Sequence, residues 1–465
     1  MASGSSSSVA NPTRPNVLLV IVDDHRADAI GALGHPVVST PVLDTLVRRG
    51  TTFSGARMAG GLMPAVCSPA RASLLTGCLP FRADAAPGIV RDPPYEVRLP
   101  ANARTLPEHF RAAGYETFLA GKWHNDTPAL LRSFEAGKNI FRGGMCEHQS
   151  VPVCDLEEIR RDAPTRPAPG FSSEIFCASA AEFVRTRDPA RPFFAWVALT
   201  SPHDPCTPPD EFRARYEARN IPLPENFRTG HNFDNGDLQV RDELLLPRPL
   251  APGQVREHLA DYYGMISHHD AHVGRVLDAL AATGQTKNTI VVYLSDHGLA
   301  LGSHGLLGKQ NLYEPSVRVP LIMAGPGVPA AHSADGLVYS FDLYATLCDL
   351  AGLPVPAGLD TRSLRPMLTP GRPQGGRETI GAAYLDCQRM VTDGRWKLIV
   401  YRVAGHERLQ LFDLEDDPLE CHDRSAEPEH ESRIAGLRAT LAAWQTEAGD
   451  RWMPLAPPVA LPTLS

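Results

Sequence analysis

The sequence predicts an α/β fold, with a large and mostly parallel sheet covered by helices on both faces. Residues 16–22 read NVLLVIV, and similar apolar runs recur further along the chain. Continuous apolar runs rich in β-branched residues fit strands that are buried on both faces. Helical patterns lie between these runs, and strands that alternate with helices are typical of a doubly wound sheet. The later strands are expected at residues 117–120, 193–199, 289–294 and 319–323.

Four segments carry helical periodicity, and the last of them is long enough to break or kink. These segments are residues 41–49, 106–113, 173–185 and 255–282. The composition changes near Leu353, and residues 354–377 are rich in Pro, Gly and Arg, which indicates a connection. Beyond it we expect a hairpin with an Asp-Gly turn, then a short strand and a closing helix. They are expected at residues 390–401, 409–414 and 437–448.

We therefore divide the chain into three parts. Residues 1–15 are Ser-rich and polar and predict a disordered lead-in. Residues 16–355 predict the main α/β domain, and residues 356–465 a smaller C-terminal subdomain with a small antiparallel sheet and a helix. The lead-in has no apolar h-region, so the protein is expected in the cytoplasm if this start is native. It is expected in the periplasm or outside the cell if a leader was removed.

Charge and composition exclude several classes of function. The net charge of the 465 residues is −8, and no polybasic run occurs, so neither nucleic acid nor an anionic membrane is an expected partner. No apolar run reaches the roughly 18 residues that a transmembrane helix needs. None of the 9 cysteines forms a pair with zinc-type spacing, so most are expected to be buried and reduced.

Ionisable residues follow four of the expected strands. Ligands of open α/β sheets sit just beyond the carboxyl ends of the strands, so we expect these side chains at one rim of the sheet. One such residue arises readily by chance, but the same feature on four strands predicts a functional site. In chain order the residues are Asp23 and Asp24, Lys122 and His124, His203, and Asp296 and His297.

The sharpest motif is Cys67-Ser-Pro-Ala-Arg71, which continues into Ala-Ser-Leu-Leu-Thr-Gly77. Pro69 fits the first turn of a helix, so Cys67 is expected at a helix N-terminus. Free N–H groups at that end favour an anion, and Arg71 adds a cation suited to oxyanions. The motif therefore predicts a nucleophile that faces an anionic group. For Cys67 taken alone, a buried structural cysteine beside a surface arginine is the alternative.

Cys-x-Pro-x-Arg followed by Leu-Thr-Gly resembles the signature of type I, formylglycine-dependent sulfatases of the alkaline-phosphatase-like superfamily. The likeness runs from Asn16 to about Leu414, near which the chain reads LFDLEDDP. It implies a mixed sheet sandwiched by helices, with a smaller C-terminal antiparallel sheet. It also implies that a formylglycine-generating enzyme oxidises Cys67 to formylglycine (3-oxoalanine). One hydroxyl of the aldehyde hydrate would attack the substrate, and the other would release the product.

A metal site is expected because adjacent Asp23 and Asp24 repel each other unless a cation neutralises them. Carboxylate oxygens suit calcium or magnesium. The resemblance implies that calcium is bound by Asp23, Asp24, Asp296, His297 and the residue formed from Cys67. Many family members have Asn where this chain has His297, while others, such as iduronate sulfatases, have His. Imidazole is softer than calcium prefers, so magnesium stays open. The alternative for Asp23-Asp24 is a solvated turn that caps a helix.

Further catalytic roles follow from the resemblance. Lys122 would contact the sulfate and the hydrate, and His124 would take a proton from the second hydroxyl and so expel sulfate. His203 and Lys309 would face the bridging oxygen, where negative charge develops as the S–O bond breaks. Arg71 would help the metal to stabilise the ionised hydrate. Taken singly, His124 and His203 could instead be histidines of the core, and Lys309 could be an ordinary surface lysine.

The predicted function is hydrolysis of sulfuric esters, on sulfated carbohydrates or aryl sulfates. Residues 142–148 and 228–241 predict long polar loops that shape the pocket. The first alternative is a phosphonate monoester or phosphodiester hydrolase of the same superfamily. The second keeps the pocket but uses Ser68 or unmodified Cys67 as the nucleophile. The third is a protein that binds sulfated ligands without turning them over.

Overall fold

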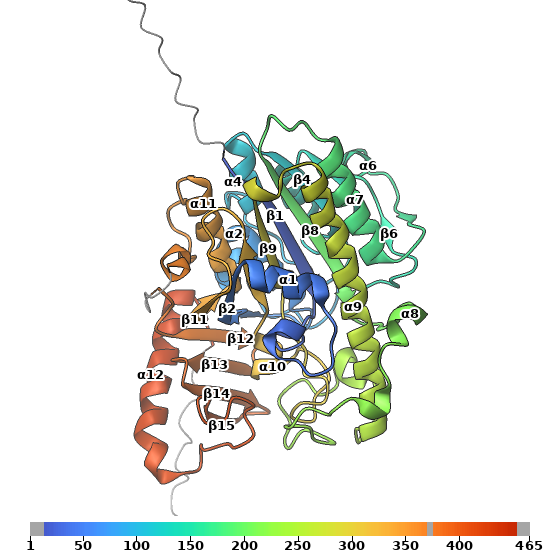
Figure 1. Cartoon of the computed structure of the whole chain (residues 1–465). Coiled ribbons are helices and arrows are strands. Elements are labelled where there is room, and N and C mark those ends of the chain that lie inside the picture. The colour runs from blue at the N-terminus through green and yellow to red at the C-terminus, as the bar shows by residue number, and fades with distance from the viewer. Residues whose placement is uncertain (1–13, 370–374, 453–465) are drawn as a thin grey trace, which may run out of the picture.

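The protein contains a large sheet and a smaller one in a computed structural model that describes residues 14–369 and 375–452 (Figure 1). In the large sheet, neighbouring strands pair in parallel, with one exception. Strand β10 (Leu321–Ala324) is antiparallel to both its neighbours. The predicted large, mostly parallel sheet is therefore confirmed. The order is β11 (His332–Tyr339), β2 (Thr51–Arg57), β10 (Leu321–Ala324), β9 (Thr289–Ser295), β1 (Asn16–Asp23), β8 (Phe193–Pro202), β4 (Glu116–Lys122) and β5 (Ala136–Phe141).

The strand at the centre is the one with the strongest sequence signal. All eight residues of β1 are buried, and β1 pairs in parallel with β8 and β9. The predicted strands at 117–120, 193–199 and 289–294 lie within β4, β8 and β9, whereas 319–323 overlaps the antiparallel β10. Strands β2, β5 and β11 were missed because they lie at or next to the sheet edges. Partly exposed positions there carry polar residues and glycine, which breaks the apolar run.

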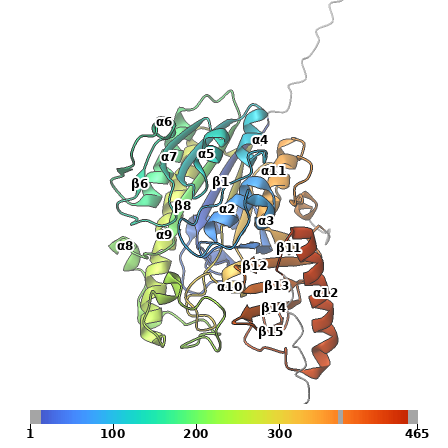
Figure 2. The same ribbon diagram turned by 180° about the vertical axis from the view of Figure 1, so that it is seen from behind.

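Helices cover both faces of the large sheet. One face packs against α1 (Pro41–Arg49), α7 (Ser172–Thr186) and α9 (Pro252–Ala282), as seen in Figure 1. The other packs against α2 (Cys67–Thr76), α4 (Leu106–Ala112), α5 (Thr127–Ser133) and α11 (Leu343–Ala351), as seen in Figure 2. The longest helical segment, which is long enough to break or kink, does not break, since α9 runs without interruption over 31 residues.

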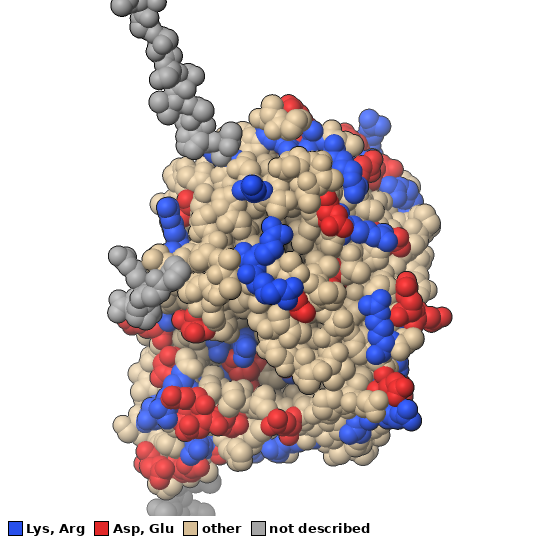
Figure 3. All heavy atoms as spheres, viewed as in Figure 1, with Lys and Arg blue, Asp and Glu red and all other residues tan. Residues whose placement is uncertain are grey.

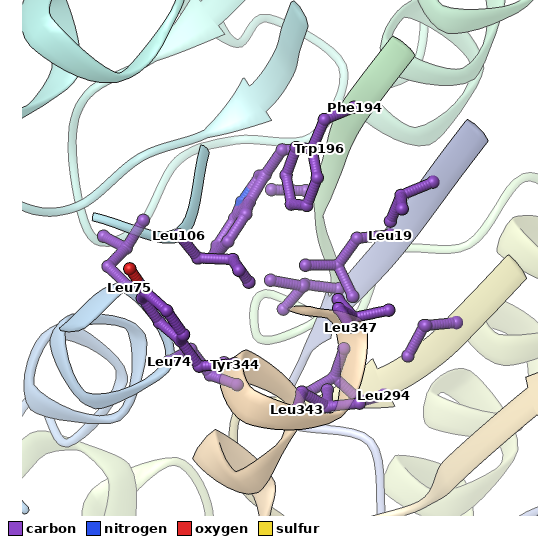
Figure 4. Packing of buried hydrophobic residues seen from close by; sticks show 14 of the residues in the cluster. Leu19, Leu74, Leu75, Leu106, Phe194, Trp196, Leu294, Leu343, Tyr344 and Leu347 are labelled. Carbon is purple, nitrogen blue, oxygen red and sulfur yellow. The ribbon is translucent and has the colours of Figure 1, made fainter. Parts of the chain in front are cut away.

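Alternate residues of β1 divide between the two layers. Leu19 packs into the cluster that contains Leu74 of α2 and Leu347 of α11, and Figure 4 shows these side chains pointing toward one another. Its neighbours Leu18 and Val20 belong to the cluster on the opposite face. Because successive side chains of a strand point to opposite faces, an unbroken apolar run anchors both helix layers at once. This anchoring holds the carboxyl end of β1 in place.

The smaller sheet joins the C-terminal part of the chain to the main body. Its strands lie in the order β15 (His406–Asp413), β14 (Trp396–Val403), β13 (Gln388–Thr392), β12 (Ile380–Tyr384) and β3 (Gly60–Gly61), beside α12 (Glu431–Ala448). The hairpin with its Asp-Gly turn is confirmed by the antiparallel pairing of β13 and β14. The four C-terminal strands are antiparallel, but β3 joins β12 in parallel. The predicted C-terminal antiparallel sheet is confirmed, and the parallel strand β3 is an addition from the main domain that the prediction did not contain.

The remaining short elements lie mostly in the loops at the strand ends. They are α3 (Pro80–Ala83), β6 (Pro152–Val153), α6 (Leu156–Arg160), β7 (Arg166–Pro167), α8 (Asp210–Arg213) and α10 (Glu314–Val317). The domain boundary at 355/356 stays a prediction. Of the predicted lead-in, residues 1–13 lie outside the described residues.

Two expectations about the surface can be compared with the structure. Within residues 14–369 and 375–452, no helix combines the length and the hydrophobicity needed to cross a membrane. On the face shown in Figure 3, lysine and arginine side chains are interspersed with aspartate and glutamate. This face therefore carries no extended patch of a single charge.

Candidate active site

All the predicted site residues meet at the carboxyl ends of four parallel strands. Asp23 and Lys122 are the last residues of β1 and β4, while His203 and Asp296 directly follow β8 and β9. These strands are neighbours in the sheet, so their ends surround one point. Cys67 lies at that point. Its sulfur is 3.2 Å from His297 Nε2 and 3.3 Å from Lys309 Nζ.

Cys67 is the first residue of α2, a helix whose residues are all buried. The small sheet holds this helix closely, because a Cβ on Gly61 of β3 would lie 2.3 Å from Pro69 Cγ. Burial alone would raise the pKa of the Cys67 thiol. The nearby cations of Lys122, Lys309 and His297 outweigh it and hold the pKa well below its ordinary range. The arrangement therefore stabilises a negative charge at this position.

Carboxylates crowd the same point. Asp23, Asp24, Cys67 and His297 each offer a ligand atom, and these atoms all lie within 4.8 Å of one another. Asp296 lies alongside, where its Oδ1 accepts the backbone N–H of Asp24 at 3.3 Å. Burial raises the pKa of Asp23 well above its usual range, and Asp296 and Cys67 add to that rise. Buried like charges of this kind call for a cation.

The donor set fits a hard dication. Asp23 Oδ1 is buried and has no hydrogen-bond partner among the described residues, so one carboxylate oxygen is left for a ligand. His297 Nδ1 lies 3.1 Å from the Gly298 carbonyl oxygen and therefore donates to it. Its Nε2 then faces Asp24 Oδ1 at 2.9 Å, so either Nε2 carries a proton or both atoms would be ligands of a metal ion. These residues can hold a metal ion, and oxygen ligands favour calcium or magnesium.

Arg71 and Lys122 surround the carboxylates with fixed positive charge. Arg71 Nε donates to Asp296 Oδ2 at 2.9 Å, and Nη1 donates to the Lys122 carbonyl at 3.1 Å. Arg71 Nη2 is buried and has no partner among the described residues, which leaves its two N–H groups for a bound oxyanion. The ammonium group of Lys122 contacts Asp23 and donates to the Gly144 carbonyl at 2.6 Å.

The two histidines near Cys67 have opposite electrostatic environments. Burial, helped by Lys122, lowers the pKa of His124 to about 4, so this imidazole is neutral at pH 7 and can accept a proton. Burial and Lys309 would also lower the pKa of His203. The carboxylates of Asp24, Asp204 and Asp23 outweigh them and raise that pKa to about 9. His203 is therefore protonated at neutral pH and can act as an acid.

Ser68 is placed away from this chemistry. Its hydroxyl accepts the backbone N–H of Val97 at 2.8 Å and lies 3.2 Å from Asn125 Nδ2. The side chain is fully buried and does not line the cavity above Cys67. Its contacts are structural, so the geometry does not favour Ser68 as a nucleophile.

A cavity of about 700 Å³ opens above Cys67. His124, His203 and Lys309 line it, together with parts of both loops that were expected to shape a pocket. Asp242 and Gln310 are among the lining residues that were not predicted. Asp242 lies 3.9 Å from Lys309 Nζ and accepts a hydrogen bond from Gln310 Nε2 at 2.8 Å. Asp242 directly follows the expected loop, and Gln310 directly follows Lys309, so adjacency was the only signal in the sequence.

The comparison with known families decides the class. A profile of the sulfatase family matches residues 15–353. The chain belongs to the sulfatase family. The prediction that the protein is a sulfatase, and therefore a sulfuric ester hydrolase, is thereby confirmed. A second profile, of the C-terminal part of N-sulphoglucosamine sulphohydrolase, matches residues 302–447 of this sulfatase.

Several known proteins match this sulfatase over nearly its whole length. An arylsulfatase of Clostridium perfringens is 28% identical, over 92% of this chain and 94% of that protein. A protein solved in complex with its substrate D-glucosamine-2-N,6-O-disulfate has the same fold, with a TM-score of 0.78 and 21% identity. The match covers 94% of this chain and 99% of that protein. The phosphonate monoester hydrolase of Agrobacterium radiobacter has it too, with a TM-score of 0.73, 22% identity and coverage of 94% and 96%.

Proposed function

We propose that this sulfatase hydrolyses sulfate esters with a formylglycine hydrate made from Cys67 by a formylglycine-generating enzyme. The observation that carries the proposal is the position of Cys67. It lies at a helix N-terminus, within 3.3 Å of both His297 Nε2 and Lys309 Nζ. The hydrate supplies one hydroxyl that attacks sulfur and a second whose deprotonation releases sulfate. The cations that stabilise a negative charge on the Cys67 sulfur would also stabilise the ionised hydroxyl of the hydrate.

The proposed metal is calcium, with magnesium as the alternative. Asp23, Asp24, Asp296 and His297 would hold it beside residue 67. When bound, the ion neutralises the buried carboxylates and withdraws charge from the sulfate oxygens. Arg71 supports this electrostatic stabilisation through the two N–H groups of Nη2, for which the described part of the chain offers no partner.

Proton transfer is assigned to the two histidines by their opposite charge states. His203 holds a proton at neutral pH and donates it to the alcohol oxygen that leaves, with Lys309 stabilising the charge there. His124 is neutral and accepts the proton of the second hydroxyl, which expels the sulfate. Lys122, fully buried beside Asp23, keeps positive charge near the sulfate throughout. A pair of groups with separated pKa values is the usual signature of acid and base roles.

The test is release of inorganic sulfate from 4-nitrophenyl sulfate by enzyme produced with and without a formylglycine-generating enzyme. We expect turnover only in the first preparation. Equal activity in a preparation whose Cys67 is entirely unmodified would contradict the proposed nucleophile. Among natural substrates, we propose sulfated saccharides, because polar loops line the cavity.

A second candidate activity is hydrolysis of phosphonate monoesters. The fold shared with the Agrobacterium radiobacter enzyme supports it. Sulfate monoesters and phosphonate monoesters each carry one negative charge, so Asp24 and Asp242 close to Lys309 do not distinguish the two substrates. Rates on 4-nitrophenyl sulfate and 4-nitrophenyl phenylphosphonate, measured with one preparation, decide between the two activities.

A further inference from the structure

The cavity above Cys67 is also lined by charged side chains that take no part in the proposed reaction. Four of these six side chains have protein partners. Arg91 pairs with Asp386, Arg241 pairs with Asp204 and Asp242, and Asp237 accepts a hydrogen bond from Tyr384. Among the described residues, no hydrogen bond or ion pair engages the side chains of the other two, Glu96 and Arg142, although the Arg142 charge opposes the rise that burial causes in the pKa of Glu96. The six are Arg91, Glu96, Arg142, Asp237, Arg241 and Asp242.

Arg142 is the more constrained of the two unpaired groups. It directly follows β5 and is half-buried, whereas Glu96 is exposed. The loop that carries it packs on the reaction centre, because the Gly144 carbonyl accepts the Lys122 hydrogen bond. A Cβ on Gly144 would lie 2.7 Å from His124 Nε2, so the loop approaches that imidazole as closely as glycine allows. The backbone of Arg142 is thus held close to the groups that act on the sulfate.

An unpaired, half-buried guanidinium favours an anionic ligand. Arginine stays protonated at all relevant pH values, and its planar fork binds carboxylate or sulfate through two hydrogen bonds. The reacting sulfate has its own cations, Lys122, Lys309 and Arg71. Arg142 contacts none of these groups directly, so its ligand is a different part of the substrate. A cavity of about 700 Å³ has the size that takes a ligand well beyond a single small group.

We propose that Arg142 binds a second anionic group, a carboxylate or a further sulfate, on the leaving alcohol of the substrate. The proposal rests on the proposed sulfatase reaction and narrows its substrate class. It favours sulfated acidic saccharides, or saccharides that carry more than one sulfate, over neutral alcohol sulfates.

The test uses aryl sulfates that differ in one substituent. The probes are 3-sulfooxybenzoate, its methyl ester, 1,3-phenylene disulfate and the 3-trimethylammonium analogue. We expect a higher kcat/KM for an anionic probe than for the ester. Arg142→Gln should reduce this preference about 10- to 100-fold, mainly through KM, since it removes one charged hydrogen-bonding group. Arg142→Lys should restore part of it. The carboxylate and disulfate probes distinguish the two anions.

Arg161→Gln is the matched control, because Arg161 is exposed and does not line the cavity. It should leave the preference unchanged. An equal loss on all probes in Arg142→Gln, or no change in preference, would overturn the role of Arg142. So would a wild-type preference for the trimethylammonium probe, which would point to Glu96. If the wild type releases sulfate from none of the probes, the proposed reaction itself is wrong.

Discussion

His297 Nε2 lies 2.9 Å from Asp24 Oδ1, while the opposite ring nitrogen donates to a backbone carbonyl. Without a metal ion, this contact requires a protonated imidazole. Burial would lower the pKa of His297, but Asp24 and Asp296 raise it well above its ordinary value. A bound dication can take the place of that proton, and its binding is coupled to the stability of the fold.

Chelation should therefore both inactivate and destabilise the protein. Dialysis against EDTA removes the proposed dication from Asp23, Asp24 and Asp296, so the melting temperature should fall together with activity. Adding calcium back at about 100 times its Kd should restore about 2.7 kcal/mol of stability. Thermal melts with calcium and with magnesium also identify the preferred ion. Unchanged melting and activity after complete chelation would contradict the metal site.

Cys67→Ala should abolish turnover without unfolding the protein. The substitution removes the proposed nucleophile, whereas the helix around it is held by buried contacts on all sides. Cys78→Ala is the matched control, because Cys78 is buried nearby but lies outside the cavity. Sulfate release and circular dichroism should be measured on both variants. Near-normal rates in Cys67→Ala would refute the proposed role.

Gly61→Ala should weaken both the fold and the activity. The new Cβ would lie 2.3 Å from Pro69 Cγ, so α2 must shift and carry Cys67 with it. We expect a loss of about 1–3 kcal/mol in the free energy of unfolding, as for other overpacked sites, and a lower kcat.

Gly436→Ala serves as the control for Gly61→Ala. A Cβ at Gly436 meets nothing within 4 Å, and the residue lies in α12, where alanine is the better helix former. It should be neutral or slightly stabilising in urea unfolding and should keep full activity. Equal behaviour of the two variants would show that β3 does not position the nucleophile.

The main features of the site were predictable because they follow local rules. An unbroken apolar run marks a central strand, and an ionisable residue directly after it marks the rim, as Asp23 shows. The contribution of β3 was not predictable. Gly60 and Gly61 have no strand pattern of their own, and they pair with β12, which is over 300 residues away in sequence. That the Arg142 side chain makes no hydrogen bond or ion pair with a described residue likewise depends on how the loops fold, so the sequence could not predict it.

Acid should destabilise the protein through buried neutral histidines. Burial lowers the pKa of His25 and His148 to about 4, and that of His268 and His304 to about 3. The unfolded chain binds protons near pH 6.5, where the folded chain does not, so the free energy of unfolding falls as the pH drops from about 6.5 toward 4. Melting temperatures should therefore decline steadily over this range. A melting temperature that stays constant or rises below pH 6 would contradict these environments.

The most direct test of the proposed nucleophile is the chemical state of residue 67 in active enzyme. The peptide that contains it should be mapped by mass spectrometry after reduction with borodeuteride, which labels an aldehyde and leaves a thiol unchanged. Across preparations with different degrees of oxidation, turnover of 4-nitrophenyl sulfate should rise in proportion to the labelled fraction. Full turnover in a preparation whose position 67 carries only the thiol would contradict the formylglycine mechanism.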